Sequence, residues 1–481
     1  MASSLKERTA KGLLWGGAAG GAQQVLALVI GIVLARRLMP ADYGMVAMLT
    51  VFSLLAGNLE EGGFTSAIAV KKQATNRDYE AVLWFSVAMG VGLYIILWFA
   101  APLIAAFNHT PQLTLIARVQ FAGFVVSGFG VAQSAYLFRH LMVKQRAIAT
   151  STAVCVGGAA GIAVVVAGGA YWGLVVQDLT YKLVVVVMYW VQSPWRPRMR
   201  FDLSPIKEMV GFSCKILATN MLTTLNNQFL QALLGHFFPR HEVGLYSQAN
   251  KWNTMGYSLV STTISSVAQP VLAAAGRQGR QKAVFRKILR LAAFLSFPAM
   301  WGIAVIAPEF VPMAMGGQWT PCVPYLQALC IAGAFIPISQ NYSNLLIARG
   351  HSAAFLKGTA AMMVVQMAVI VWAHCVEAGM LALVMGVGAL QVVWVAVWHF
   401  TARREIALRA VEALRDIVPF AAGAAMAMAA AYLAAMPIEL PIVRMVVKIL
   451  TAAAVYCAIM HFAHAKIFSE SVAFLLQRFK H

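Results

Sequence analysis

The chain has 481 residues, of which 60% are hydrophobic and only 11% are charged, and its formal net charge is +20. About a quarter of the residues in an ordinary soluble domain are charged, so this composition excludes a soluble globular protein. We interpret the basic excess as cytoplasmic loop charge near anionic lipid headgroups, and we expect no nucleic-acid binding.

Long apolar segments follow one another along the whole chain. A helix needs roughly 20 apolar residues to cross a bilayer, and about 14 segments approach or exceed that length. The predicted transmembrane helices are 12–35, 43–70, 81–107, 113–137, 147–169, 171–192, 208–237, 243–274, 289–308, 320–348, 355–374, 379–400, 417–436 and 442–465. The first is too long for a cleavable signal peptide, so we interpret it as the first transmembrane helix.

Basic residues are concentrated in every second gap between these segments. Of the 37 Lys and Arg, 28 lie in those gaps or at the chain ends, four lie in the alternate gaps and five lie within segments. Basic loops stay cytoplasmic. Because the number of segments is even, we expect both termini in the cytoplasm. Every gap is too short to hold a soluble catalytic domain, so we do not expect an enzyme.

A short motif recurs near the start of each half of the chain. Asp42 stands two residues before Gly44, and Glu242 stands two residues before Gly244, each time between two long apolar segments. The acid is suited to cap the incoming helix, and Gly permits a close turn. The repeat predicts an all-α integral membrane fold of two six-helix bundles and a C-terminal helix pair with a tail. The predicted parts are 1–200, 201–402 and 403–481.

Charged residues at membrane depth are costly and tend to mark transport pathways. We predict that Glu60, Glu61 and Asp178 carry a coupling ion. Lys182 lies near the middle of its predicted helix, where it either pairs with Asp178 at i,i+4 as a structural contact or faces a water-filled cavity. Glu60 and Glu61 can alternatively form a solvated helix end near the basic segment 71–77.

Polar side chains are frequent in three of the predicted spans, 208–237, 243–274 and 320–348. Taken singly, such amides can bond neighbouring helices. Together they suit a hydrated, cationic cavity that accepts sugar hydroxyls and an anionic cargo. Arg118 and Lys215 lie about 10 Å from a helix end and can alternatively serve as interfacial anchors. The predicted substrate-binding residues are Lys251, Lys182, Arg118, Lys215, Asn250, Tyr246, Asn227, Gln340 and Asn341.

Metal and nucleotide motifs are missing from the sequence. The six Cys show no CxxC spacing, and the ten His are scattered. We therefore expect no disulfide framework and no metal site. HExxH, a P-loop and a Gly-rich nucleotide fingerprint are also absent. We expect no cofactor and no ATP hydrolysis by this chain.

Four segments resemble the polysaccharide-transporter branch of the multidrug/oligosaccharidyl-lipid/polysaccharide exporter superfamily. They begin LARRLMPADYG at residue 34, LEEGGFTSAIAVKK at 59, FRKILRLAAFLSFP at 285 and LLIARGHSAAFLKG at 345. The resemblance runs over about residues 5–400 and is closest to lipopolysaccharide and exopolysaccharide biosynthesis flippases of bacterial inner membranes. Members often carry an aspartate with glycine late in the second span, where this chain has Glu60-Glu61-Gly62-Gly63.

The resemblance implies a flippase that moves undecaprenyl-pyrophosphate-linked oligosaccharides across the inner membrane by alternating access of two bundles. Its expected partners are the lipid-linked oligosaccharide, membrane lipids and a polysaccharide polymerase with other biosynthesis proteins. One alternative is a cation-coupled drug or metabolite antiporter of the same superfamily, in which Glu60 or Glu61 carries the coupling ion. A second alternative is a membrane-embedded polymerase or glycosyl-transfer enzyme. It is disfavoured because the chain lacks a long extramembrane loop with paired acids.

Overall fold

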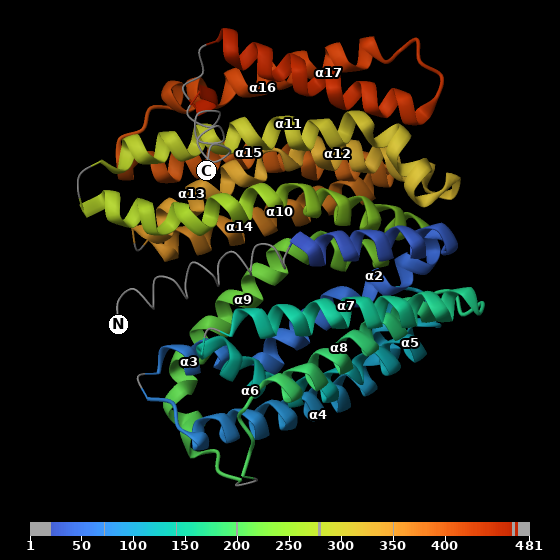
Figure 1. The fold of residues 1–481 in the computed structure, drawn as a ribbon, viewed down its shortest axis with the longest axis vertical. Coiled ribbons are helices and arrows are strands. Elements are labelled where there is room, and N and C mark those ends of the chain that lie inside the picture. The colour runs from blue at the N-terminus through green and yellow to red at the C-terminus, as the bar shows by residue number, and fades with distance from the viewer. Residues whose placement is uncertain are drawn as a thin grey trace. The chain divides into compact units, whose positions relative to one another are not determined.

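The computed structural model describes residues 21–71, 73–140, 142–198, 201–277, 280–349, 351–463 and 467–469. The regular structure of these residues is entirely helical (Figure 1). Eleven segments among them are long and apolar enough to cross a membrane. The chain is therefore a multi-pass, all-α membrane protein, as its composition predicts. The count of 14 spans stays a prediction: segment 12–35 begins outside the described residues, and 208–237 and 243–274 form helices that are not among the eleven.

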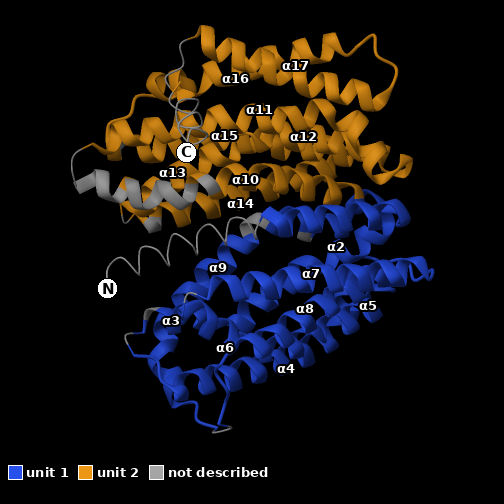
Figure 2. Cartoon of the chain, viewed as in Figure 1, with its two compact units in different colours: residues 1–244 blue, residues 245–481 orange. Residues whose placement is uncertain are grey.

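Residues 1–244 group into one compact unit, called unit 1 here (Figure 2). Within it α7 packs along α8, α6 packs on α4 and α8, and α9 packs on α2. Its described helices are 21–37, α2 (Pro40–Glu61), α3 (Phe64–Val70), α4 (Asn76–Phe107), α5 (Leu113–Phe121), α6 (Gly123–Arg139), α7 (Val143–Val166), α8 (Trp172–Gln192) and α9 (Ser204–Phe237).

Residues 245–481 form unit 2. Its helices are α10 (Arg240–Arg277, which starts in unit 1), α11 (Gln281–Met315), the 3-10 helix η1 (Gly317–Cys322), α12 (Val323–Gly333), α13 (Ile336–Ala348), α14 (Ser352–Cys375), α15 (Met380–Ile406), α16 (Ala410–Ala434) and α17 (Pro441–Phe462). Helices α16 and α17 pack on each other and on α11 (Figure 1). The predicted bundle boundaries at residues 200 and 402 stay predictions.

The repeated motif has a structural role at both of its positions. Asp42 caps α2, because its carboxylate accepts a hydrogen bond from the backbone N–H of Met39 at 2.9 Å. The glycines do not form turns, however, because each lies inside a helix. A Cβ on Gly44 would stand 1.8 Å from the carbonyl oxygen of Arg240, and a Cβ on Gly244 would stand 1.7 Å from that of Pro40. The missing side chains allow the starts of α2 and α10 to touch at a reciprocal backbone contact.

Two of the predicted spans in unit 1 are interrupted rather than continuous. Span 43–70 divides into α2 and α3 at Gly62 and Gly63, and span 113–137 divides into α5 and α6 at Ala122. Gly62 and Gly63 have φ values of 58° and 72°, a left-handed conformation that Gly adopts at little cost. The break sets the direction in which the end of α2 presents its side chains.

Helix α11 is longer than the sequence predicts. The segment 289–308 was bounded by charged residues, but the helix runs from Gln281 to Met315. It therefore includes Glu309, which the apolar pattern assigns to the following gap. Glu309 stands just beyond the predicted span, and its buried partner Lys448 allows the helix to continue through it.

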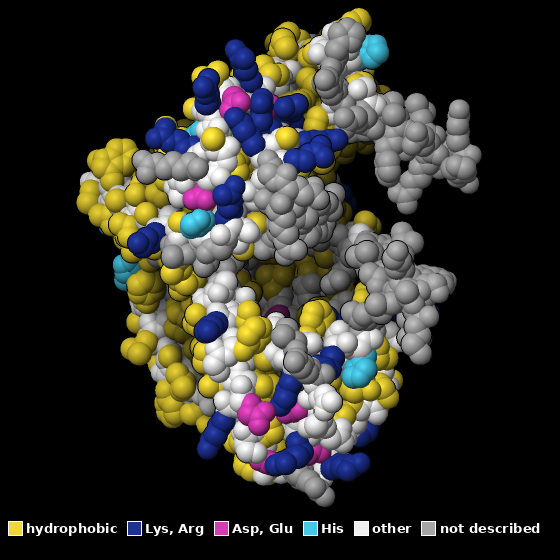
Figure 3. All heavy atoms as spheres, turned by 90° about the vertical axis from the view of Figure 1, so that its left-hand side faces the viewer, with side chains coloured by type: hydrophobic (Ala, Val, Ile, Leu, Met, Phe, Trp, Pro, Cys, Tyr) yellow, Lys and Arg dark blue, Asp and Glu magenta, His cyan; other side chains and the backbone are white. Residues whose placement is uncertain are grey.

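The linker between α8 and α9 is held by polar contacts at one end of unit 1. Asp202 accepts hydrogen bonds from Ser204 and from the Arg77 guanidinium, and these contacts lower the pKa of Asp202 below its ordinary range. Lys71 bonds Asp78 and Glu208 at 2.8 and 2.9 Å, which raises the pKa of Lys71. Figure 3 shows Lys and Arg side chains gathered on the surface of each unit, taken by itself. The charge distribution along the sequence predicts such clusters at cytoplasmic loops.

Candidate functional site

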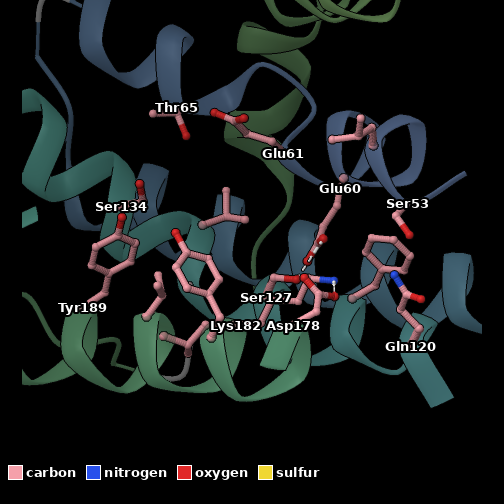
Figure 4. A pocket seen from close by; sticks show the side chains of 18 of the residues that line it. Ser53, Glu60, Glu61, Thr65, Gln120, Ser127, Ser134, Asp178, Lys182 and Tyr189 are labelled. Carbon is pink, nitrogen blue, oxygen red and sulfur yellow. Dashed lines mark hydrogen bonds and ion pairs between the residues drawn. The ribbon is translucent and has the colours of Figure 1, made fainter. Parts of the chain in front are cut away.

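A cavity of about 580 Å³ lies within unit 1, among helices that qualify as membrane spans (Figure 4). Helices α2, α6 and α8 provide most of its wall, and α3, α5 and α7 complete it. The polar and charged side chains in this wall are Thr50, Ser53, Glu60, Glu61, Thr65, Gln120, Ser127, Ser134, Arg146, Asp178, Tyr181, Lys182 and Tyr189. The cavity thus combines hydroxyls with charges at membrane depth.

Glu60 is almost completely buried, with 3% of its surface exposed. Its Oε2 accepts a hydrogen bond from the Ser127 hydroxyl at 3.2 Å. Its Oε1 is buried and has no hydrogen-bond partner among the described residues. Gly90 of α4 lies opposite: a Cβ there would stand 3.5 Å from Oε1, an ordinary contact, and 2.6 Å from the Phe124 carbonyl oxygen. A carboxylate oxygen in this setting is available to a proton or to a cation.

Lys182 enters the same cavity from the midpoint of α8, about 15 Å from either end of the helix. Its ammonium group lies 2.8 Å from the carboxylate of Asp178, one turn earlier. It also stands 5.1 Å from the centre of the Phe124 ring. Gly123, at the start of α6, permits this approach, because a Cβ there would come within 3.0 Å of the ammonium nitrogen. Lys182 therefore pairs with Asp178 and also lines a cavity, so the two interpretations of this residue are compatible.

The charge balance of this cavity is slightly acidic. Its wall contains three carboxylates, those of Glu60, Glu61 and Asp178, and two bases, Lys182 and Arg146. With every group ionised the wall has a net charge of −1. The described part of unit 1 thus brings all three predicted coupling residues into one site, together with one of the predicted substrate ligands.

Two other predicted ligands in unit 1, Arg118 and Lys215, are not part of this wall. Arg118 is on α5, and its guanidinium lies 4.6 Å from the centre of the Trp98 ring on α4. Its role as ligand or as anchor stays a prediction. Lys215 is exposed on α9. The side chain of Asn227 lies outside the described residues.

Unit 2 contains the remaining predicted ligands. On α10, Lys251 is exposed, Asn250 is half-buried and Tyr246 is buried. On α13, Gln340 is half-buried, whereas Asn341 is fully buried and both of its side-chain polar atoms lack a partner among the described residues. These five assignments stay predictions.

Several cavity residues were not predicted from the sequence, although a pattern marks them. Thr50, Ser53, Gly57 and Glu60 recur at helical spacing along one face of α2, and Ser127 and Ser134 do so on α6. A stripe of hydroxyls and glycine at intervals of three to four residues in an apolar helix indicates a polar-facing side. The sequence prediction rested on single charged residues and did not use this stripe. No group of three or more His, Cys, Asp or Glu in the described residues could hold a metal ion.

Comparison with known proteins assigns the family. A family model described as "Polysaccharide biosynthesis protein" matches residues 33–324. The chain belongs to this family. It is 24% identical over 355 residues to the lipopolysaccharide biosynthesis protein WzxC of Escherichia coli (strain K12), which covers 72% of this chain and 71% of that protein. It is 26% identical over 353 residues, 72% of each chain, to an uncharacterized membrane protein in the cps region of Klebsiella pneumoniae.

A solved structure has the same fold. The lipid II flippase MurJ in an inward closed conformation aligns with a TM-score of 0.77, covering 94% of this chain and 99% of that one at 12% sequence identity. At this identity the likeness establishes the fold alone. The family resemblance stated from the sequence is confirmed by the family match.

Proposed function

We propose that this member of the polysaccharide biosynthesis family is a flippase that moves undecaprenyl-pyrophosphate-linked oligosaccharide units across the bacterial inner membrane by alternating access. The observation that carries the proposal is a polar cavity inside a bundle of membrane spans, in a chain whose family match covers 33–324. A carrier must offer polar groups to sugars at membrane depth, and hydroxyls of Ser, Thr and Tyr in the cavity wall are suited to that. The protein acts as a transporter and not as an enzyme.

The cavity of unit 1 also supports a role in energy coupling. We assign the coupling ion to Glu60, with Glu61 and Asp178 as neighbouring acids. Glu60 has one oxygen bonded to Ser127 and one oxygen unpartnered within the described residues. When Glu60 is ionised, it competes with Asp178 for Lys182; when it binds a proton or cation, Lys182 returns to Asp178. Cargo contacts would then come from the cavity hydroxyls, Lys251 and the amides of α10 and α13.

Topology and partners follow from the proposed function. Both termini would lie in the cytoplasm, where lipid-linked units are assembled, and the product would reach a polysaccharide polymerase on the periplasmic side. Membrane lipids surround the apolar faces of the spans.

A second candidate is supported by one observation, the excess of carboxylates in the cavity. Three acids against two bases suit a cationic compound better than a pyrophosphate. A cation-coupled antiporter of drugs or metabolites is therefore the alternative.

The deciding experiment removes the protein from its native strain and extracts polyprenyl-linked oligosaccharides together with the surface polymer. A flippase predicts that the complete repeat unit accumulates on the cytoplasmic leaflet while the polymer is lost. An antiporter predicts unchanged polymer and altered sensitivity to cationic compounds. An enzyme of assembly predicts truncated or unpolymerised units on the periplasmic leaflet. Unaffected polymer, in a strain where no related transporter substitutes, would refute the flippase proposal.

A further inference from the structure

Helix α11 contains three prolines, Pro298, Pro308 and Pro312, within an otherwise continuous helix. A proline lacks the N–H that would bond the carbonyl four residues earlier, and its ring pushes against that carbonyl. Pro298 and Pro308 therefore leave the carbonyls of Phe294 and Ala304 without their helical donors. In a membrane no water is available to replace such a bond, and an unsatisfied carbonyl costs several kcal/mol.

Side chains from two different helices occupy these freed carbonyls. The hydroxyl of Tyr456 on α17 donates to the Phe294 carbonyl at 3.0 Å. The amide of Gln327 on α12 donates to the Ala304 carbonyl at 3.1 Å. Each donor meets the carbonyl that the proline four residues later has released. Because this match occurs at two prolines independently, we infer that the two side-chain donors compensate for the hydrogen bonds that the prolines remove.

A second contact from α17 reaches the turn beside Pro308. The ammonium of Lys448 donates to the Val305 carbonyl at 3.0 Å and to both oxygens of Glu309 at 2.7 and 2.8 Å. Lys448 and Glu309 are both buried, and the ammonium lies 5.6 Å from the centre of the Tyr432 ring on α16. All three N–H groups of the lysine thus have acceptors on α11.

One face of α17 makes these contacts. Its buried residues recur every four positions: Lys448, Ala452, Tyr456 and Met460. Two of the four are polar, and both bond backbone carbonyls of α11. The neighbouring helix α16 adds Asp416, which accepts from Arg286 and Arg290 near the start of α11. The C-terminal helix pair therefore contacts α11 through polar groups before, at and beyond Pro298.

We propose that α17 is a positioning element for α11: Tyr456 replaces the hydrogen bond that Pro298 removes, and Lys448 holds the turn beside Pro308 through Val305 and Glu309. Together they hold the bend that the prolines impose on α11 and that transport requires. The C-terminal pair is then a working part of the transporter rather than a peripheral addition. Gln327 on α12 likewise donates a hydrogen bond to the Ala304 carbonyl, in place of the one that Pro308 removes. The stability part of this inference stands alone, and only its transport part rests on the proposed flippase function.

A pair of double-mutant cycles on the full-length protein tests the stability part by thermal unfolding. Tyr456→Phe removes only the hydroxyl and should lower the thermal midpoint by about 2–4 °C, as expected for one lost buried hydrogen bond in a unit of this size. In a Pro298→Ala background the restored N–H bonds Phe294, so the same change should have little effect. Gln327→Leu should behave likewise with Pro308→Ala.

The crossed combinations are the matched controls. Tyr456→Phe with Pro308→Ala, and Gln327→Leu with Pro298→Ala, join residues that do not share a carbonyl, so their effects should add. The inference is overturned if Tyr456→Phe lowers the midpoint equally in the wild-type and Pro298→Ala backgrounds. It is also overturned if the crossed pairs couple as strongly as the matched pairs.

Transport of the lipid-linked repeat unit tests the second part. Pro298→Ala should fold at least as well as the wild type yet export less than half as much polymer per folded molecule. Wild-type export by Pro298→Ala would overturn the link between the bend and transport. If the deletion strain exports as much polymer with an empty vector as with the wild-type gene, the proposed function is refuted. The unfolding cycles would still decide the role of Tyr456.

Discussion

Two lysine–carboxylate pairs of the described residues, Lys182 with Asp178 and Lys448 with Glu309, differ in how completely they are satisfied. In unit 1, Lys182 and Asp178 meet at 2.8 Å with side chains 19% and 37% exposed to a cavity. In unit 2, Lys448 and Glu309 meet at 2.7 Å with side chains 4% and 6% exposed, and a backbone carbonyl completes the lysine's coordination. The same chemistry thus appears once beside an open space and once without one.

This difference in exposure distinguishes a candidate functional site, at Lys182 and Asp178, from a structural contact, at Lys448 and Glu309. In the closed pair all three N–H groups of the lysine have acceptors and both side chains are buried, so the pair can exchange partners only if its surroundings move. The open pair lies beside Glu60, whose Oε1 has no hydrogen-bond partner among the described residues. There the lysine can change partners when a proton, a cation or a cargo arrives. We therefore propose a structural role for Lys448 and a coupling role for the cluster around Lys182.

The largest expected effect is at the closed pair. Lys448→Met leaves Glu309 buried and unpaired, which should destabilise the protein by about 3–5 kcal/mol. The double change Lys448→Met with Glu309→Gln removes both charges and should recover most of that loss. Thermal unfolding of the purified variants measures both values. If Lys448→Met alone is as stable as the wild type, the pair is not closed as described.

The next effect concerns the break that positions Glu60. Gly63→Ala places a side chain at a φ of 72° and brings a Cβ within 2.7 Å of the Ser213 carbonyl oxygen. The strain should destabilise the protein by about 1–3 kcal/mol. Gly57→Ala, on the same helix with open space around its Cβ position, is the control and should be neutral or stabilising. Equal behaviour of the two variants would argue against a strained break.

How far the sequence alone predicted this molecule depends on the type of signal. Apolar runs and loop charges predicted the membrane class, and the motif around Asp42 predicted a helix cap that the structure confirms. Glu60, Glu61, Asp178 and Lys182 were selected individually, and the folded chain brings them to one cavity. That meeting depends on how α2, α6 and α8 pack, which no single segment encodes.

Other features were beyond a reading of single segments. The pair of Lys448 and Glu309 was missed because Glu309 lies just past the predicted end of its span, where a charge is unremarkable. Tyr456 and Gln327 have no distinguishing sequence pattern, since a polar residue in a span becomes informative only when its partner carbonyl is known. The prolines that release those carbonyls are visible in the sequence, but the donors are not.

A smaller effect on stability is expected at the open pair. Because the pair is partly exposed to the cavity, Asp178→Asn with Lys182→Gln should change stability by only about 0.3–0.5 kcal/mol, the range of an i,i+4 pair. Export of polymer should nevertheless fall, because both coupling partners are lost. If the double variant exports as well as the wild type while Lys182→Gln alone does not, the lysine serves only to neutralise Asp178.

The smallest effect is expected at the pair of Arg77 and Asp202, whose side chains are 65% and 32% exposed, and this pair provides the baseline for the other two. Asp202→Asn should loosen the linker before α9, seen as faster amide exchange over residues 201–204, with no measurable shift of the thermal midpoint. Because the pKa of Asp202 is lowered, its contribution is present above its ordinary pKa and disappears only as the pH falls through the lowered value. Exchange in the wild type should therefore not change between pH 7 and pH 5 beyond the intrinsic rate.

The central claim is that the open cluster couples an ion to transport, and translocation in proteoliposomes tests it most directly. Purified protein is given a lipid-linked repeat unit under an imposed proton gradient, an imposed sodium gradient or neither. The wild type should respond to one of the gradients, and folded Glu60→Gln should translocate at a rate that responds to neither. The double variant Lys448→Met with Glu309→Gln should keep the wild-type response. Gradient dependence that survives in Glu60→Gln would contradict the account.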